Sequence, residues 1–183
     1  DYENEPDAVV ATENLLAQQL FGPQPGAEVV IAELDDSPVG FALFFHNFST
    51  WEGRRGLYLE DLFVVEEARR RGVGRALMVH LARLAVERDC ARFEWSVLDW
   101  NTPAIGFYRG IGAVGMDEWT VQRLDGDALV ALAREAGDAG RSAQMTALTV
   151  QASTEAWDHQ YEAAVALLRE ALPVAVSLGA AEA

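Results

Sequence analysis

The sequence predicts an α/β (α+β) fold, in which helices flank a central sheet. Three observations lead to this fold class. Segments rich in β-forming residues recur before residue 66, apolar residues then follow a helical period from Gly72, and the composition is that of a globular protein. Of the 183 residues, 50% are hydrophobic and 23% are charged, so the chain can bury one core.

The first part of the chain predicts a helix and then strands. Residues 11–21 carry leucines at helical spacing behind Thr12, a residue type that caps helix N-termini. Residues 28–34 and 39–48 are strand-like, and the Asp-Asp-Ser-Pro turn between them predicts a hairpin. Residues 56–65 form the next predicted strand.

Helical and strand patterns alternate beyond residue 72. Val73, Leu77 and Leu81 share one stripe at four-residue steps, which predicts a helix over residues 72–88. The other predicted elements are a strand at 93–98, a helix from Asn101 or Thr102 to about Gly110, strands at 113–117 and 119–124, and a helix at 127–135.

The C-terminal part reads as an appended unit. Residues 137–144 form a predicted linker, and residues 145–183 hold a strand at 146–152 followed by a helix at 155–172. These pieces follow a first predicted domain over residues 1–136.

The balance of charges limits the classes of molecule that the protein is expected to bind. The chain has 14 basic and 29 acidic residues, for a net charge of −15. This argues against nucleic acid, which needs a basic surface, and suits a small cationic amine that a negative field would attract. The alternative is an acidic surface that only keeps the protein in solution.

Several further features point to a cytoplasmic protein without a metal. No apolar run approaches the roughly 20 residues that span a bilayer, and residues 1–7 lack the order of a signal peptide, so no membrane partner is expected. The single cysteine, Cys90, fits a reducing compartment. His46, His80 and His159 do not have the spacing of metal ligands.

The sharpest motif lies between the strand at 56–65 and the helix at 72–88. It reads Arg69-Arg70-Arg71-Gly72-Val73-Gly74, with Arg75 and Ala76 beyond it. A helix start presents unpaired N–H groups and a partial positive charge, glycines allow close approach of phosphate, and arginines add charge. The alternative is a glycine turn with a solvated basic face. The motif is neither a Walker loop nor a complete dinucleotide fingerprint.

Arg69-x-x-Gly72-x-Gly74 resembles the R/Q-x-x-G-x-G/A signature of the GCN5-related N-acetyltransferases (GNAT). The segments Tyr58-Leu59-Glu60-Asp61-Leu62-Phe63-Val64, Trp100-Asn101-x-Pro103 and Phe107-Tyr108 extend the likeness, which is greatest to the spermidine/spermine and thialysine acetyltransferase group. The resemblance implies the GNAT fold, a mixed twisted sheet in which two parallel strands splay apart around acetyl-CoA. Residues 1–136 would form this core without its usual first strand and helix, which residues 145–183 could supply within one chain or by exchange between protomers. A simple C-terminal extension is the alternative.

The resemblance also implies the coenzyme contacts. The pantetheine arm of acetyl-CoA would pair with the backbone of Leu62, Phe63 and Val64, and Asn101 would lie near the thioester. The diphosphate would be held by the bend and helix start, namely Arg69, Arg70, Arg71, Gly72, Val73, Gly74, Arg75 and Ala76.

Two residues resemble the family's proton-transfer groups. Tyr108 would protonate the departing CoA thiolate, and Glu60 would assist deprotonation of the amine. Tyr108 could instead be a core tyrosine, and Glu60 a carboxylate bound to a backbone or arginine partner. Strand alternation places Glu60 and Asp61 on opposite faces.

The amine site would include Glu60, Asp61, Trp51 and Glu52. Ser49 stands roughly where the polyamine enzymes have an acidic residue, so the choice among polyamine, diamine and thialysine-like substrates stays open. The predicted function is N-acetylation of a primary amine by a homodimer. The alternatives are a CoA-binding module without catalysis and a protein or antibiotic N-acetyltransferase.

Overall fold

The computed structural model describes residues 9–138 and divides into two compact units between Ile105 and Gly106. The strand expected at 146–152 and the helix expected at 155–172 lie outside the described residues. Gly137 and Asp138, expected to begin the linker, belong to helix α4 (Gly126–Asp138).

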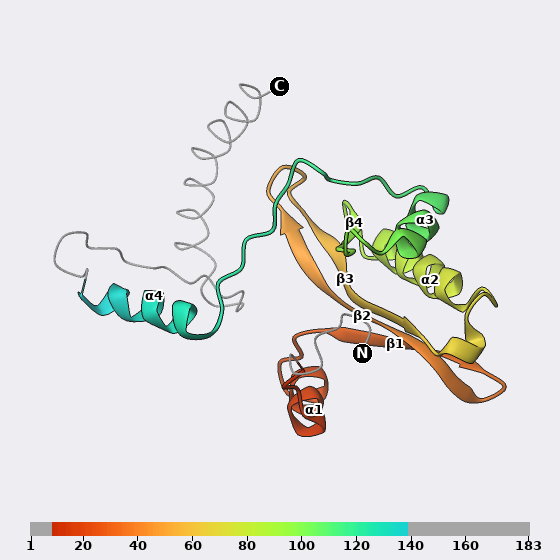
Figure 1. Ribbon diagram of the computed structural model, residues 1–183, viewed down its shortest axis with the longest axis horizontal. Coiled ribbons are helices and arrows are strands. Elements are labelled where there is room, and N and C mark those ends of the chain that lie inside the picture. The colour runs from red at the N-terminus through yellow and green to blue at the C-terminus, as the bar shows by residue number, and fades with distance from the viewer. Residues whose placement is uncertain (1–8, 139–183) are drawn as a thin grey trace. The chain divides into compact units, whose positions relative to one another are not determined.

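A mixed sheet in the order β1-β2-β3-β4 forms the first unit (Figure 1). Its strands are β1 (Glu28–Leu34), β2 (Ser37–Ser49), β3 (Arg54–Val64) and β4 (Phe93–Trp95). The β1–β2 and β2–β3 pairs are antiparallel, whereas β3 and β4 are parallel. This arrangement confirms the predicted mixed sheet with a parallel pair.

Local chemistry explains the first elements. Helix α1 (Glu13–Phe21) begins where Thr12 accepts the Leu15 N–H through its Oγ1 at 3.2 Å, as the sequence predicts. The β1–β2 hairpin closes through Asp35 and Asp36, whose φ angles are 51° and 60°. Aspartate tolerates this left-handed conformation, and two such residues make the turn whose twist matches a hairpin.

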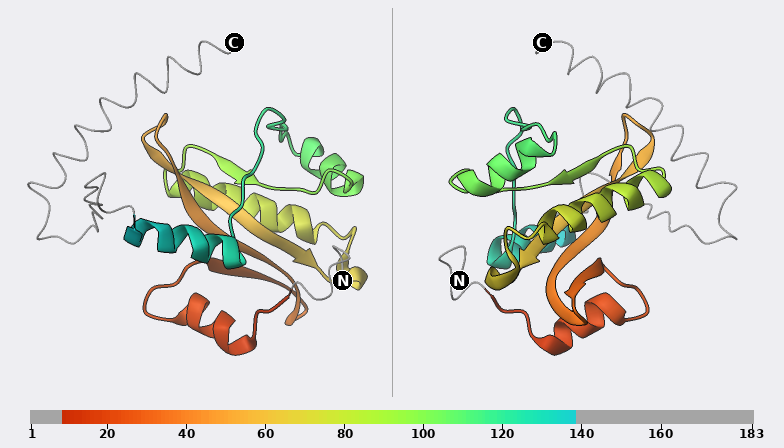
Figure 2. Two further views of the ribbon diagram at one scale, coloured as in Figure 1. Left: turned by 60° about the vertical axis from the view of Figure 1, so that its left-hand side comes forward. Right: turned by 90° about the vertical axis from the view of Figure 1, so that its right-hand side faces the viewer.

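The core lies between the sheet and helix α2 (Val73–Glu87), which runs along one face of the sheet (Figure 2). Its buried apolar side chains are Val73, Leu77, Met78, Leu81 and Ala85 from α2, and Ala42, Phe44, Leu57 and Leu59 from the sheet. Each large side chain buried there contributes about 1.5–3 kcal/mol relative to exposure. The helical stripe read from the sequence is therefore the face that meets the sheet.

An ion pair attaches the C-terminal end of α2 to β1. Arg88 donates from Nη1 and Nη2 to the two carboxylate oxygens of Glu28 at 2.5 and 2.7 Å, and its guanidinium lies 5.8 Å from the centre of the Phe44 ring. The hydrogen bond from Arg88 lowers the pKa of Glu28. Burial, followed by the positive charge of Arg88, lowers the pKa of His46 beside them. Helix and sheet are thus joined by charge as well as by apolar contact.

Three predicted strands differ from the structure. β4 ends at Trp95, so residues 96–98 are not strand. Residues 113–125 contain neither helix nor strand. Val114, Trp119 and Val121 are 82%, 72% and 78% exposed there. Residues with high β-propensity form a strand only where another strand can pair with them, and these segments have no such neighbour in the described part of their unit.

Helix α3 (Thr102–Gly110) crosses the division between the units and agrees with the predicted bounds. Within residues 9–138, no helix is both long enough and apolar enough to cross a bilayer.

Candidate functional site

The parallel strands β3 and β4 separate after a short ladder. Their described pairing runs over three residue pairs and ends at Leu59 and Trp95. The next residue of β3, Glu60, is an extra residue in the ladder with β2, because Leu59 pairs with Phe44 and Asp61 with Leu43. Such a bulge bends a strand and increases its twist. The bulge thus coincides with the end of the β3–β4 ladder, and the side of β3 from Glu60 to Val64 that has no β4 partner is here called the gap.

Only alternate backbone groups of β3 face this gap. Val65 donates its N–H to the Val39 carbonyl of β2 at 2.9 Å, and successive strand residues direct their backbone groups to opposite sides. Phe63 therefore points its backbone toward β2, where it pairs with Phe41, while Leu62 and Val64 present theirs to the gap. Of the three residues expected to pair with a ligand, Leu62, Phe63 and Val64, only Leu62 and Val64 have backbone groups on the side of the gap.

The start of α2 offers donors near the end of this open edge. Gly72 is its N-cap, has a φ of 86°, and makes no side-chain capping bond. Helix geometry leaves the N–H groups of Val73, Gly74 and Arg75 without an intrahelical acceptor, which suits an anion. The N–H of Ala76 donates to the Gly72 carbonyl at 2.9 Å, so the predicted phosphate contact of Ala76 loses its donor.

The arginines of the bend differ in their contacts. Arg70, Arg71 and Arg75 are exposed, and Arg70 has a left-handed φ of 61°. A non-glycine residue in that region costs about 1–3 kcal/mol, and such residues concentrate at ligand sites. Arg69 instead donates from Nε to the Val64 carbonyl at 3.0 Å. The arginines therefore do not form one equivalent set of phosphate ligands.

The bulge corrects the expected placement of the two carboxylates. Strand alternation separates Glu60 from Asp61, but an extra residue interrupts that alternation. Directly paired residues share a face, so Asp61 lies on the face of Leu43, opposite the face that contacts α2. Both carboxylates are exposed. Simple alternation therefore does not separate the two carboxylates, and their placement in one cleft stays a prediction.

A pair of hydroxyls lies at the point where the strands separate. Tyr58 Oη and Ser96 Oγ are 2.7 Å apart and join β3 to the residue after β4. Tyr58 belongs to the motif quoted for the resemblance, but the sequence does not indicate that its hydroxyl pairs with Ser96. Predicting this pair requires the register of β3 against β4, which sequence spacing does not provide.

Asn101 is nearly buried and caps helix α3. Its Oδ1 accepts the Ala104 N–H at 3.2 Å, and its own N–H donates to the Leu98 carbonyl at 2.8 Å. Because the carbonyl oxygen of the side chain is used in the cap, the Nδ2 group is the part available to donate to a ligand.

Trp51 and Glu52 are not brought together with Glu60 in one chain. Both lie in the turn between β2 and β3, and Trp51 is 66% exposed. Glu60 is six residues beyond the start of β3 at Arg54, which is about 20 Å along an extended strand. Ser49, in place of the polyamine enzymes' carboxylate, is buried and accepts the Glu52 N–H at 3.2 Å.

Tyr108 lies on α3 in the second unit. Its ring centre is 5.3 Å from that of Phe107, and its carbonyl accepts the N–H groups of Ile111 and Ala113 at the end of the helix. Its catalytic role stays a prediction.

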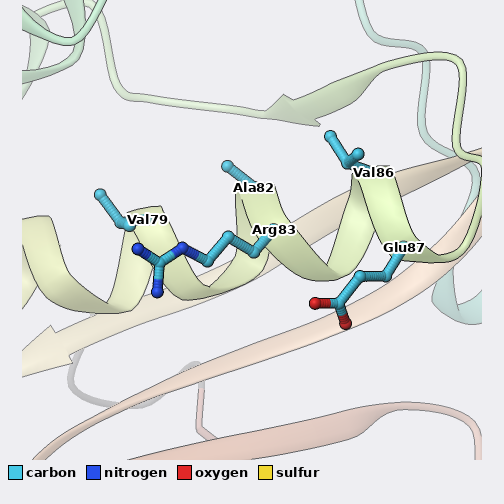
Figure 3. Close-up of a pocket in the computed structure, with 5 residues that line it drawn as sticks. All are labelled: Val79, Ala82, Arg83, Val86 and Glu87. Atoms are coloured by element: carbon cyan, nitrogen blue, oxygen red, sulfur yellow. The ribbon is translucent and has the colours of Figure 1, made fainter.

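Two further features of residues 9–138 bear on the site. No group of three or more histidine, cysteine or acidic side chains there could hold a metal ion. A shallow hollow lies on the exposed side of α2, lined by Val79, Ala82, Arg83, Val86 and Glu87 (Figure 3). None of the predicted site residues lines it, so it is separate from the gap.

Comparison with known proteins identifies the family of the chain. Residues 2–113 match the model of the acetyltransferase (GNAT) family. The thialysine N-epsilon-acetyltransferase of Bos taurus is 33% identical over 144 residues, covering 73% of this chain and 84% of that enzyme. This confirms the resemblance to the group that includes the thialysine acetyltransferases, and the expected class of N-acetyltransferase.

A further relative and a solved structure differ in the share of each chain that the similarity covers. L-ornithine N5-acetyltransferase of Arabidopsis thaliana is 41% identical over 115 residues, which is 63% of this chain and 47% of that enzyme. The chain thus spans about half the length of this relative. A solved integron cassette protein from the mobile metagenome of V. cholerae is 34% identical with a TM-score of 0.63, covering 73% of this chain and 83% of that one.

Proposed function

Because the chain belongs to the acetyltransferase (GNAT) family, we propose that it transfers the acetyl group of acetyl-CoA to a primary amine of a small cationic substrate. One observation carries this proposal. Within a single stretch of chain, the open edge of β3 is followed by the N-terminus of α2, whose N-cap Gly72 makes no side-chain hydrogen bond.

The residues present fit acetyl-CoA. The pantetheine arm contains amides, which the outward backbone groups of Leu62 and Val64 can bind as an added strand would. The N–H groups beyond Gly72 suit the diphosphate. The space beside Gly72 is open, because a Cβ atom placed there would have no other atom within 4 Å. Arg70 and Arg71 supply exposed positive charge beside it.

The chemistry needs one proton accepted and one donated. Acetyl-CoA supplies the thioester that the amine attacks. The Glu60 carboxylate accepts the proton that the substrate ammonium must lose, directly or through a water molecule, and Asp61 on the same stretch attracts the cation. The Tyr108 hydroxyl donates a proton to the departing thiolate, a role proposed from the motif that it resembles.

The substrate class follows from charge and from the relatives. The net charge of −15 favours a cationic substrate. The relatives' names, ornithine N5- and thialysine N-epsilon-acetyltransferase, both describe an amine at the end of a side chain. We therefore favour diamines and amino acids of this kind over long polyamines, since Ser49 is buried and carries no charge.

Thiol release from acetyl-CoA tests the proposal across ornithine, thialysine, lysine, diamines and polyamines. We expect the largest kcat/KM with the terminal-amine amino acids and short diamines. Tyr108→Phe should reduce kcat by about 100-fold or more and leave the Kd for CoA almost unchanged. If no amine supports thiol release although calorimetry detects CoA binding, the chain is a CoA-binding module without catalysis.

A further inference from the structure

One arginine of the bend makes a contact that a phosphate ligand would not need. Arg69 donates from Nε, the nitrogen within its side-chain stem, to the carbonyl of Val64 at 3.0 Å. Val64 is the last residue of β3, and the 3₁₀ turn Glu66–Ala68 separates the two partners. The side chain thus folds back from the bend to the end of the strand.

This contact uses one of the few polar groups on the open edge. Val64 presents both its N–H and its carbonyl to the gap, because Val65 points its backbone to β2. Arg69 occupies one lone pair of the Val64 carbonyl, so the N–H and carbonyl of Leu62 and the N–H of Val64 are the groups of this edge that stay fully open. An incoming amide chain that shifts toward the bend would have to share the Val64 carbonyl with Arg69, which favours the register centred on Leu62.

We propose that Arg69 is a positioning residue that sets the register of the pantetheine arm on β3 and is not a ligand of the diphosphate. The inference rests on the proposed function. The arm has a fixed length, so its register on β3 decides where the thioester lies relative to Glu60. Arg69 therefore acts on the reacting atoms through the strand edge, whereas Arg71 acts on the diphosphate through its charge.

A matched set of variants separates these roles. Glutamine places its Nε2 the same number of bonds from the backbone as the Nε of arginine, so Arg69→Gln keeps the donor and removes the charge. Arg69→Met has similar length without a donor. Arg71→Met removes a neighbouring exposed charge that makes no contact with the strand edge and is the control.

Hydrogen exchange in the free protein tests the contact without any coenzyme. We expect Arg69→Met to speed amide exchange in residues 65–72 by about tenfold, because the bend loses its attachment to β3. Arg69→Gln and Arg71→Met should stay close to the wild type. Equal exchange in Arg69→Met and the wild type would overturn the contact, and this result does not depend on the proposed function.

Kinetics with two thioesters then test the register. S-acetylpantetheine carries the pantetheine arm but no phosphate, so it reports on the strand edge alone. Arg69→Met should lower kcat by about tenfold with both acetyl-CoA and S-acetylpantetheine, and Arg69→Gln should restore most of the loss. Arg71→Met should raise the KM for acetyl-CoA only.

The opposite pattern would overturn the proposal. If Arg69→Met and Arg69→Gln both raise the KM for acetyl-CoA and leave S-acetylpantetheine unaffected, Arg69 is a charge ligand like Arg71. Failure of the proposed function differs from this, because the wild type itself would then turn over neither thioester while the hydrogen-exchange difference persists.

Discussion

Strand β3 has two halves that serve different purposes. From Arg54 to Leu59 it pairs with β2, and its last three residues there also pair with β4, with Leu57 and Leu59 buried against α2. Beyond the extra residue Glu60, Asp61 to Val64 pair with β2 only, and both carboxylates and Phe63 are exposed. One inserted residue in the ladder marks the change from one half to the other.

The difference shows how a single strand can supply both rigidity and binding groups. The first half satisfies its backbone within the protein and fills the core. The second half leaves alternate backbone groups without a strand partner, which we propose bind the ligand, while its pairing with β2 holds them in place. We expect substitutions in the first half to change stability, and those in the second half to change turnover.

The largest expected effect is on turnover, at the bulge itself. Glu60→Gln keeps the shape of the side chain and removes the base, so kcat should fall by about 10²- to 10⁴-fold. The free energy of unfolding should change little because the side chain is exposed. Steady-state kinetics and urea denaturation measure the two quantities. Asp61→Asn is the control, and an equal loss of kcat there would assign the base to the pair rather than to Glu60.

A stability change in the paired half should be the next largest. Leu57 is fully buried, so Leu57→Ala should cost about 2–5 kcal/mol of unfolding free energy. Leu62→Ala removes the same atoms from a half-buried site in the open half and should cost less than half as much. Urea titrations of both variants provide the comparison. Equal losses would mean that the two halves are packed alike.

The smallest effect concerns pH and lies outside both halves, at the ion pair that attaches α2 to β1. In the folded protein the pKa of His46 lies below its ordinary value of 6.5, and that of Glu28 lies below its ordinary value of 4.5. Both groups therefore stabilise the fold above those values and lose that contribution as the pH falls, first through His46 and then through Glu28. Urea midpoints should decline from about pH 6.5 downward, and less steeply in His46→Gln. A midpoint that rises on acidification would contradict the assignment.

Much of the fold could be predicted because its signals are local. The capping residue Thr12 precedes a helical stripe, two aspartates form a turn, and a glycine starts α2. Each of these signals determines the structure of only the few residues around it. The predicted bounds of α1, β1, β2, β3, α2 and α3 agree with the structure to within about two residues.

The site could be predicted only as a set of residues, because its geometry depends on pairing. The extra residue at Glu60 exists only relative to β2, and it interrupts the alternation from which the sequence argument related Glu60 to Asp61. The contact of Arg69 with Val64 and the Tyr58–Ser96 pair likewise need the path of the chain in space. Residues 113–125 show the converse, since β-forming composition there lacks a pairing partner among the described residues of the unit.

The salt bridge between Arg88 and Glu28 also affects the other end of helix α2. Fifteen residues of α-helix form a stiff rod about 22 Å long, so restraining its last turn fixes the direction of its axis. The N–H groups beyond Gly72, which we propose bind the diphosphate, then keep their direction in the free protein, so binding would require less ordering. A glutamate on an outer strand thereby contributes to the preorganisation of a site that it never touches.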